Sequence, residues 1–321
     1  MPDATNFCPT LPDLSLSDVG ALNRALDALV ELAWEPGWAP QALARLVALC
    51  DELRAAHDAA GWQQALATLR AHPLQRLMLE EPLVREGLAR PGPGPGPATL
   101  DLLLEHASVQ PVLAQLSRAG RDLAAALRQL GYPAALRAQT RFLARIVDAV
   151  AERRPQAEIL TLGAGHLREA ELVTQGRAIT RWVMQDSDGD ALTRARREAP
   201  PGLPLRALRC GLPYFIRRPY LRGCFDLITL AELPGCERNA VQLVDAAFAA
   251  LKPGGSLLLG SAAAPPAEAA WLEAYLGWRP CWRMPEEMER LAAVPPASEL
   301  AAARVFPSLD GHRLYLRLER R

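Results

Sequence analysis

One stretch in the middle of the chain constrains the fold more than any other: Glu158-Ile-Leu-Thr-Leu-Gly-Ala-Gly-His-Leu-Arg-Glu-Ala170. It opens with a β-prone apolar run that stops at two glycines, Gly163 and Gly165, and a helix-compatible segment, 166–175, follows at once. Strand, glycine turn and helix begin the ligand cleft of doubly wound α/β domains, because only glycine lets backbone approach a ligand closely. Arg168 stands where a dinucleotide-binding turn has a small residue, so the stretch is a poor pyrophosphate loop. A glycine turn between a strand and a helix is, taken alone, as compatible with a purely structural role as with ligand binding.

After this stretch, apolar runs alternate with helical segments, which is the pattern of a parallel sheet. We expect strands at 158–163, 178–185, 205–208, 225–230 and 256–260, and helices at 191–197 and 239–251. Two further strands, 303–306 and 313–318, flank Asp310-Gly311, a dipeptide typical of an antiparallel hairpin. The sequence therefore predicts an α/β domain whose parallel strands end in an antiparallel hairpin, which is not how a dinucleotide-binding domain ends.

The first half of the chain follows the helical period throughout. We expect helices from a Ser17 cap to Ala33, from Pro40 to Gly61, and at 62–71, 73–88 (interrupted by Pro82), 98–106, 111–130 and 133–152. Alternating Pro and Gly over Arg90–Pro97 cannot sustain a helix or a strand, so we expect an extended, exposed loop there. That loop is either a spacer or a lid over the cleft. The predicted domains are an N-terminal all-helical cap at 1–132, with the loop at 90–98, and an α/β domain at 133–321.

Composition narrows the class of protein. The 36 basic and 36 acidic side chains cancel, which gives no electrostatic reason to expect nucleic acid or an anionic membrane as partner. No apolar run approaches the roughly 18 residues of a membrane span, and the polar N-terminus does not resemble a signal peptide. The six cysteines form no C-x-x-C pair, so we expect reduced thiols, no metal site and a cytoplasmic protein. Lys252 is the only lysine, and the Arg, Ala and Pro bias suggests a bacterial coding sequence.

A sheet that ends in a hairpin resembles the Rossmann-like sheet of class I S-adenosylmethionine (SAM) methyltransferases, and several motifs carry the resemblance further. Gly163–Ala170 resembles the C-G-H-L-R-E-A stretch of a bacterial methyltransferase family that includes the enzyme thought to make methyl 3-hydroxypalmitate, a quorum-sensing ester. The likeness covers most of the chain from His72 onward. The other matching segments are His72–Leu83 (H-P-L…D-P-F in the family), Phe225–Ile228 (F-D-L-I), Leu251–Gly255 (L-x-P-G-G) and Gly277–Met288 (D-W…R-x-x-E-E-M). The family is described as a helical cap on a SAM-binding domain.

SAM carries a ribose diol, an adenine and an amino-acid tail but no phosphate, so its site needs close backbone approach and a carboxylate for the two ribose hydroxyls. Asp186 follows the second strand, where that carboxylate belongs, although turn aspartates are often only caps. Arg137, Arg141 and Arg145 recur every four residues on the helix before the glycine turn, and this row either is a solvated face or reaches the cofactor's carboxylate. The expected cofactor-binding residues are Gly163, Ala164, Gly165, His166, Glu169, Asp186, Ser187, Cys210, Gly211, Leu212, Ala231, Arg137 and Arg141.

The residues expected to face the methyl acceptor, the molecule that receives the methyl group, depart from the family pattern. The Pro/Gly loop replaces a K-P-R-G-Y-A-G-D segment, Ala231–Glu237 lacks the family's tyrosines, Ala164 replaces the Cys of C-G-H, and Ser261-Ala262 replaces a polar N-F pair. Two candidate bases remain. Glu232 follows the fourth strand, and is either a general base or an ordinary exposed glutamate; His166 is either a base or a packed or capping residue.

Three functions are compatible with these features. The first is a SAM-dependent methyltransferase of secondary metabolism that methylates a carboxylate or hydroxyl of a small or lipid-like molecule. Methyl transfer of this kind needs little beyond alignment of the reacting centres and exclusion of water. The second is a catalytically degenerate SAM-binding homologue that acts as a partner or regulatory subunit. A homodimer or heteromer through the helical domain is compatible with either. The third, an NAD-dependent oxidoreductase, is disfavoured by Arg168 and the terminal hairpin.

Overall fold

The computed structural model describes residues 19–33, 35, 37–217 and 221–321, so the expected Ser17 cap lies outside the described residues. Contacts divide the chain into two compact units. One holds the described part of Met1–Ala89 with Gln110–Arg128 and Ala267–Gly277, and the other holds Arg90–Val109, Gln129–Pro266 and Trp278–Arg321. The units are thus discontinuous in sequence, which differs from the single boundary expected at 132/133. The Pro/Gly loop belongs to the α/β unit, and one late helix belongs to the helical unit.

The first unit is helical. It contains α1 (Val19–Leu32), α2 (Trp38–Ala56), α3 (Ala59–Ala71), α4 (Leu74–Met78), α5 (Pro82–Ala89), α7 (Gln110–Leu113), α8 (Arg118–Leu127) and α13 (Ala269–Leu276). Two side-chain caps move the expected boundaries. The Asp58 carboxylate accepts from the Gly61 N–H at 2.8 Å, so a new helix starts before Gly61 rather than after it. The Ser117 hydroxyl accepts from the Gly120 N–H at 2.9 Å and splits the helix expected at 111–130.

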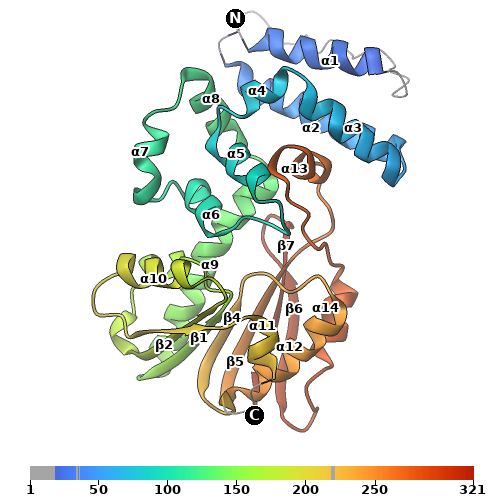
Figure 1. Cartoon of the computed structure of the whole chain (residues 1–321). Coiled ribbons are helices and arrows are strands. Elements are labelled where there is room, and N and C mark those ends of the chain that lie inside the picture. Colours follow the sequence, from blue (N-terminus) through green and yellow to red (C-terminus); the bar gives the residue numbers. More distant parts are fainter. Residues whose placement is uncertain (1–18, 34, 36, 218–220) are drawn as a thin grey trace, which may run out of the picture. The chain divides into compact units, whose positions relative to one another are not determined.

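The second unit is built on one seven-stranded sheet of order β3-β2-β1-β4-β5-β7-β6 (Figure 1). Its strands are β1 (Ala157–Leu162), β2 (Ile179–Asp186), β3 (Leu205–Arg209), β4 (Phe225–Leu230), β5 (Leu251–Ala262), β6 (Leu300–Pro307) and β7 (Arg313–Arg320). The first five strands are parallel, and β7 pairs antiparallel with both β5 and β6. The predicted parallel sheet ending in an antiparallel hairpin is confirmed. The order is not that of a simple Rossmann sheet.

Helices cover both faces of this sheet. Successive strand residues point to opposite faces, and here both sets are apolar, so each face needs a layer of helices. Ile159 packs with Val147 of α9 (Gly131–Arg153) and Leu192 of α10 (Gly189–Glu198). Its neighbour Leu160 packs into the opposite core, which includes Val244. The helices on that opposite face are α11 (Leu212–Ile216), α12 (Glu237–Ala249) and α14 (Pro285–Ala292), with α6 (Pro97–Leu104) and three 3₁₀ turns, η1 (Ala107–Val109), η2 (Arg168–Leu172) and η3 (Gly176–Ala178), completing the unit.

The helix expected at 166–175 is the clearest error of the sequence prediction. The chain forms only the five-residue 3₁₀ turn η2, because Leu167 before it adopts a left-handed conformation with φ 51° and ψ 48°. A left-handed residue cannot propagate a right-handed helix, and for a leucine it costs on the order of 1–2 kcal/mol. Burial of Leu167 in the core of the α9 face offsets this cost.

Strand order fixes where a ligand would bind. β1 lies between β2 and β4, and the chain runs outward from β1 through β2 to β3 before it returns to β4 on the other side. The connections on either side of β1 therefore leave in opposite directions, and in open α/β sheets ligands bind at such a point, here the carboxyl ends of β1 and β4. The glycine turn follows β1, and Ala231 and Glu232 follow β4, so both lie at this switch point.

Candidate functional site

The glycine turn bends sharply at the end of β1. Gly163 and Gly165 have φ of 60° and 51°, and Leu167 continues this alternation of left-handed residues. A Cβ on Gly163 would lie 3.6 Å from the Leu230 side chain of β4, which is an ordinary contact distance. A Cβ on Gly165 would lie 3.1 Å from Pro97, the first residue of α6, which is tight. The left-handed conformation therefore favours glycine at both positions, and close approach adds to this at Gly165.

Asp186, at the end of β2, faces this turn. Its Oδ2 accepts from the Gly165 N–H at 2.8 Å, and its Oδ1 accepts from the Asp188 N–H at 2.9 Å. Its side chain is half-buried, and Ser187 beside it is exposed. Asp188 has a different role, because its Oδ1 caps α10 by accepting from the N–H groups of Asp190 and Ala191. Of these aspartates, only Asp186 is bonded to the glycine turn.

Gln185 links three strand ends, and the sequence analysis missed it. Its Oε1 accepts from the Gly163 N–H at 3.2 Å, and its Nε2 donates to the Cys210 carbonyl. The side chain is 1% exposed. Cys210, which precedes the half-buried pair Gly211 and Leu212, also donates its N–H to the Asp186 carbonyl at 2.9 Å. The only signal in the sequence was an amide at the penultimate position of a parallel strand.

Glu169 is the unusual carboxyl of the turn. It lies in η2, which packs against α9, and its side chain is buried. Burial raises the pKa of Glu169 to about 7 from an ordinary 4.5, and only its own backbone N–H opposes this. Among the described residues, no cation is paired with it. The carboxyl is therefore held close to the balance between its neutral and ionised forms at neutral pH.

The remaining cofactor candidates lie apart from these bonds. Arg137 is half-buried and Arg141 exposed on α9. The Ala231 carbonyl is already occupied, because it accepts from Gln139 Nε2 at 2.8 Å and from Arg313 Nη2 at 2.6 Å. The structure thus joins the glycine turn, Asp186 and Cys210 through direct bonds.

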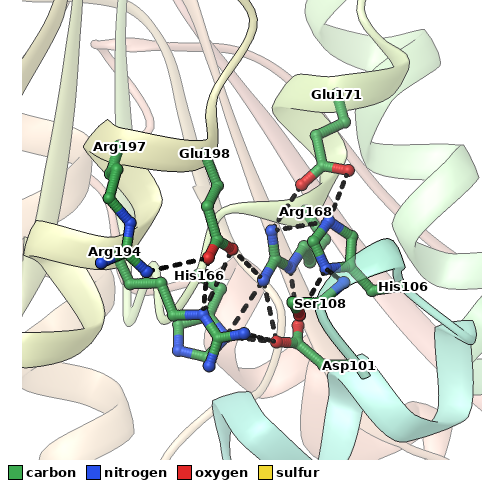
Figure 2. A network of polar contacts seen from close by, with 9 residues as sticks. All are labelled: Asp101, His106, Ser108, His166, Arg168, Glu171, Arg194, Arg197 and Glu198. Atoms are coloured by element: carbon green, nitrogen blue, oxygen red, sulfur yellow. Dashed lines mark hydrogen bonds and ion pairs between the residues drawn. The ribbon is translucent and has the colours of Figure 1, made fainter. Parts of the chain in front are cut away.

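A buried ionic cluster, the Arg168 cluster, lies beside the turn (Figure 2). Arg168 is 3% exposed and Asp101 of α6 is 0% exposed. Arg168 Nε donates to Asp101 Oδ1 at 2.6 Å and Arg168 Nη2 donates to Asp101 Oδ2 at 2.8 Å, a two-pronged pair. Glu171 and Glu198 accept from the same guanidinium at 2.5 and 2.7 Å. His106, His166 and Arg194 also belong to the cluster, and Ser108 and Arg197 are bonded to its His106 and Glu198 (Figure 2).

This cluster explains the residue that made the turn a poor pyrophosphate loop. Burial alone would raise the pKa of Asp101, but hydrogen bonds from His166 and Arg168 outweigh it and hold that pKa below its ordinary range. The carboxylate is therefore ionised when the chain is folded. Since Asp101 lies just beyond the Pro/Gly loop, its pair with Arg168 fixes that loop's end to the glycine turn, where Pro97 packs on Gly165. Residues 90–96 form neither a helix nor a ladder strand, as expected, but several are half-buried and Gly92 is bridged to Trp278, so the loop is not a free, fully exposed spacer.

Both candidate bases have partners. His166 is 9% exposed, and its Nδ1 lies 2.9 Å from Asp101 Oδ2. Glu232 accepts from the Ala262 N–H at 3.1 Å with Oε1, and its Oε2 lies 2.7 Å from Nη1 of Arg313, which is fully buried. Glu232 is thus neither an isolated surface residue nor a free carboxylate. Neither sequence reasoning nor spacing pointed to Asp101 or Arg313, which are far away in the chain.

Arg313 forms a second group, the Arg313 cluster, with Tyr132, Ala231 and Glu232. Burial lowers the pKa of Arg313, but the charge of Glu232 outweighs it and the pKa is raised above the ordinary value. Arg313 Nη1 also donates to the Tyr132 hydroxyl at 3.3 Å, while its Nε is buried without a hydrogen-bond partner among the described residues. Tyr132 meets the Trp282 ring edge-on, at 5.3 Å between centroids. Aromatic groups are therefore present on this side, although the family's tyrosines are not.

Other features of the described residues do not add to this site. Two cavities, of about 650 and 620 Å³, are lined by α11 with α12 and by α10 with β3 respectively, and neither includes the glycine turn. In the described ranges, no three His, Cys, Asp or Glu side chains gather as metal ligands, and Cys50, Cys210, Cys224, Cys236 and Cys281 are free thiols. No helix within those ranges has the length and apolar character needed to cross a membrane.

Comparison with known proteins gives a fold but no family. No protein-family model and no curated protein matches the chain. Among solved structures, a possible exported protein from Bordetella parapertussis matches at 16% identity and a TM-score of 0.58, over 94% of this chain and 96% of that chain. This likeness shows a shared fold alone.

Many other matching structures are SAM-dependent methyltransferases. The trans-methyltransferase CalH in complex with S-adenosylhomocysteine (SAH) has 18% identity and a TM-score of 0.41, over 55% of either chain. The magnesium protoporphyrin IX methyltransferase of Synechocystis PCC 6803 with bound SAM has 12% identity and a TM-score of 0.41, over 59% of this chain and 84% of that chain. Both likenesses are too distant to carry an argument about the chemistry of this chain.

Proposed function

We propose that this chain is a SAM-dependent methyltransferase and that SAM binds at the switch point between β1 and β4. One observation carries the proposal: the left-handed Gly163 and Gly165 lie where strand order reverses, and the Asp186 carboxylate of the next strand is bonded to that turn. The two glycines let a ligand approach the backbone closely, and the carboxylate beside them can accept hydrogen bonds from ribose hydroxyls. This combination suits a nucleoside that carries no phosphate. When bound, SAM would supply an electrophilic methyl group.

The hydrogen-bond capacity of Asp186 supports its role toward the ribose. An ionised carboxylate has about four lone-pair sites. The N–H groups of Gly165 and Asp188 take one on each oxygen, at 2.8 and 2.9 Å, and this leaves one on each oxygen for the two hydroxyls of a diol. Because the backbone holds both oxygens, the carboxylate is positioned before the ligand arrives, which reduces the entropy cost of binding.

The acceptor is proposed to be a carboxylate or hydroxyl of a small molecule. Arg283 is 5% exposed, donates Nη1 to the Ser261 hydroxyl at 2.9 Å and has no ion pair among the described residues. Its backbone N–H donates to the carbonyl of Ala262, whose own N–H donates to Glu232, so Arg283 is linked through Ala262 to the carboxylate that Arg313 pairs. This excess of two cations over one carboxylate favours an acceptor whose oxygen is anionic or becomes so, and such an oxygen needs only alignment and exclusion of water, or one base.

The cofactor half of the proposal is tested by calorimetric titration and thermal unfolding with SAM and SAH. A ligand at a hundredfold its dissociation constant stabilises the fold by about 2.7 kcal/mol. Asp186→Asn should lose most of this stabilisation, because an amide offers only one acceptor oxygen. Asp188→Asn is the matched control, since Asp188 caps α10 and is not bonded to the turn. Absence of binding by the unmodified protein, or equal loss in both variants, contradicts the proposal.

A degenerate SAM-binding homologue is the second candidate. The packing of Pro97 on Gly165 and the pairing of both Glu232 oxygens favour it, because they occupy groups that a turnover site would use. The two candidates differ in turnover. Incubation with methyl-labelled SAM and a panel of carboxylic acids and phenols should give labelled product only if the chain is catalytic, whereas SAH binding without product on any acceptor favours the partner role.

A further inference from the structure

The two candidate bases differ in what a proton would cost their partners. Glu232 has one partner on each oxygen, the Ala262 N–H and Arg313 Nη1, and its protonation would leave the fully buried Arg313 guanidinium without a charged partner. The contacts of the His166 ring with Asp101 and Arg168 are both made by Nδ1, and no described residue is hydrogen-bonded to Nε2. If the proposed reaction needs a proton acceptor in this unit, His166 can therefore take the proton at Nε2 without breaking an ion pair, whereas Glu232 cannot.

The partner of His166 fixes its protonation. Asp101 Oδ2 lies 2.9 Å from His166 Nδ1, and the Asp101 carboxylate is fully buried. A carboxylate held ionised by Arg168 can only accept hydrogen bonds, so the 2.9 Å contact requires the proton on Nδ1. Arg168 Nη2 can only donate, but at 3.5 Å from Nδ1 it is the weaker of the two contacts. In a neutral imidazole the other nitrogen is then an acceptor, and Nε2 keeps its lone pair.

We infer that Asp101 is a positioning residue for His166: it holds the imidazole in the Nδ1–H form and so keeps Nε2 ready to accept a proton from the acceptor. This inference rests on the proposed methyltransferase function. The proton of an acceptor hydroxyl passes to Nε2, and the oxygen keeps the electron pair of the broken O–H bond. The imidazolium that forms keeps its Nδ1–H on Asp101 and later returns the other proton to water.

The charges around the ring are consistent with this role. Arg168 Nη2 lies 3.5 Å from His166 Nδ1, and Arg194 Nη2 lies 3.4 Å from Asp101 Oδ2. Behind them, Glu198 and Glu171 pair with Arg168, and His106 pairs with Glu171. The cations near the ring are thus matched by carboxylates, and Asp101 is the only carboxylate bonded to His166 in the described part of the chain (Figure 2).

The test is the tautomer of His166 in the full chain without ligand. Ring ¹⁵N shifts are recorded at a pH where the imidazole is neutral, and His166→Gln assigns the signals among the five histidines. We expect a pyrrole-like Nδ1 and a pyridine-like Nε2 in the unmodified protein. The opposite pattern, or a mixture of both, overturns the inference.

Two variants separate positioning from mere stability. Asp101→Asn has only one acceptor oxygen for Arg168 and His166, so its amide group should face Nδ1 and shift the ring toward the Nε2–H form. Glu171→Gln removes charge from the same cluster at a residue that does not contact His166. In this variant the tautomer of His166 should stay as in the unmodified protein. A tautomer that stays unchanged in Asp101→Asn, or that changes equally in Glu171→Gln, contradicts the inference. If Asp101→Asn does not fold, the unmodified protein and Glu171→Gln decide.

This experiment is independent of the cofactor proposal. SAH is titrated into the same samples, so binding and tautomer are read separately. Failure of SAH to bind would contradict the proposed function while the tautomer still reports on Asp101. A wrong tautomer with tight SAH binding would contradict the positioning role alone.

Discussion

Two buried arginines of the α/β unit are paired in different ways. Arg168 meets three carboxylates, of which Asp101 is fully buried, and every nitrogen of its guanidinium has a partner. Arg313 meets one carboxylate, Glu232, whose side chain is 29% exposed, and its own Nε has no partner among the described residues. The Arg168 guanidinium is thus fully paired, although His166 Nε2 of its cluster has no described partner, whereas the Arg313 cluster reaches solvent at Glu232 and leaves one guanidinium nitrogen unpaired among the described residues.

The difference indicates different roles. A buried ion pair is weak evidence for net stability, because desolvation can exceed the Coulombic gain, yet breaking such a pair is strongly destabilising. The Arg168 cluster therefore holds a local geometry, namely the glycine turn against the start of α6. The Arg313 cluster is less completely paired, because its carboxylate is partly exposed and one buried guanidinium nitrogen has no partner among the described residues.

The largest effect should come from Arg168→Met. The substitution leaves Asp101 at 0% exposure without its two-pronged partner, and we expect a loss of about 3–5 kcal/mol in the free energy of unfolding. Urea unfolding followed by circular dichroism measures it. A loss below about 1 kcal/mol would show that the cluster is more hydrated than its burial indicates.

The next prediction compares the loss in the free energy of unfolding when either partner of the Glu232–Arg313 pair is replaced. Glu232→Gln leaves a fully buried guanidinium without a charged partner, and we expect a loss of about 2–4 kcal/mol. Arg313→Met leaves a carboxylate that reaches water, and should lose only about 1–2 kcal/mol. The reverse order of the two losses in urea would contradict the view that this cluster is open at Glu232.

Glu169 extends the comparison to a buried carboxyl that is paired with neither arginine cluster. Its pKa is about 7 in the folded chain against an ordinary 4.5, so between these values the folded state binds more protons than the unfolded state, and stability falls as pH rises. Glu169→Gln should remove this fall. At about 1.4 kcal/mol per pKa unit, the variant should be more stable than the unmodified protein by up to about 3 kcal/mol at pH 8 and nearly equal to it at pH 4.

Urea midpoints across this pH range give the measurement. Glu81→Gln is the matched control, because burial raises the pKa of Glu81 to about 7 as well, and Glu81 lies in the helical unit. Both variants should flatten the pH dependence, but only Glu169→Gln should also change SAH affinity. An unchanged pH dependence in Glu169→Gln would mean that water reaches this carboxyl.

The smallest effect is expected outside both clusters. Asp188→Ala removes the cap of α10, where the Asp188 carboxylate accepts two backbone N–H groups, and should cost about 1 kcal/mol. Affinity for SAH should change little, in contrast to Asp186→Asn. Equal loss of affinity in both variants would mean that this loop acts as a unit and that Asp186 has no separate role.

Sequence patterns determined the sheet of this protein. Strand periodicity and the Asp310-Gly311 turn predicted β1 to β7, since alternation and turn chemistry are local properties. The same patterns placed Gly163, Gly165 and Asp186 at strand ends, and the structure brings these three together. They failed at 166–175, because the conformation of Leu167 is held by packing against residues remote in sequence.

Only the tertiary structure decided what surrounds the turn. Asp101 and Arg168 are 67 positions apart, and Arg313 and Tyr132 are 181 apart, so no local pattern could indicate that they would be paired. Arg168 looked like a defect in a glycine motif, and burial against Asp101 makes it the anchor of the turn. Local periodicity encodes strands and turns, whereas the pairing of buried charges depends on which distant segments the fold brings together, because a buried charge requires a partner.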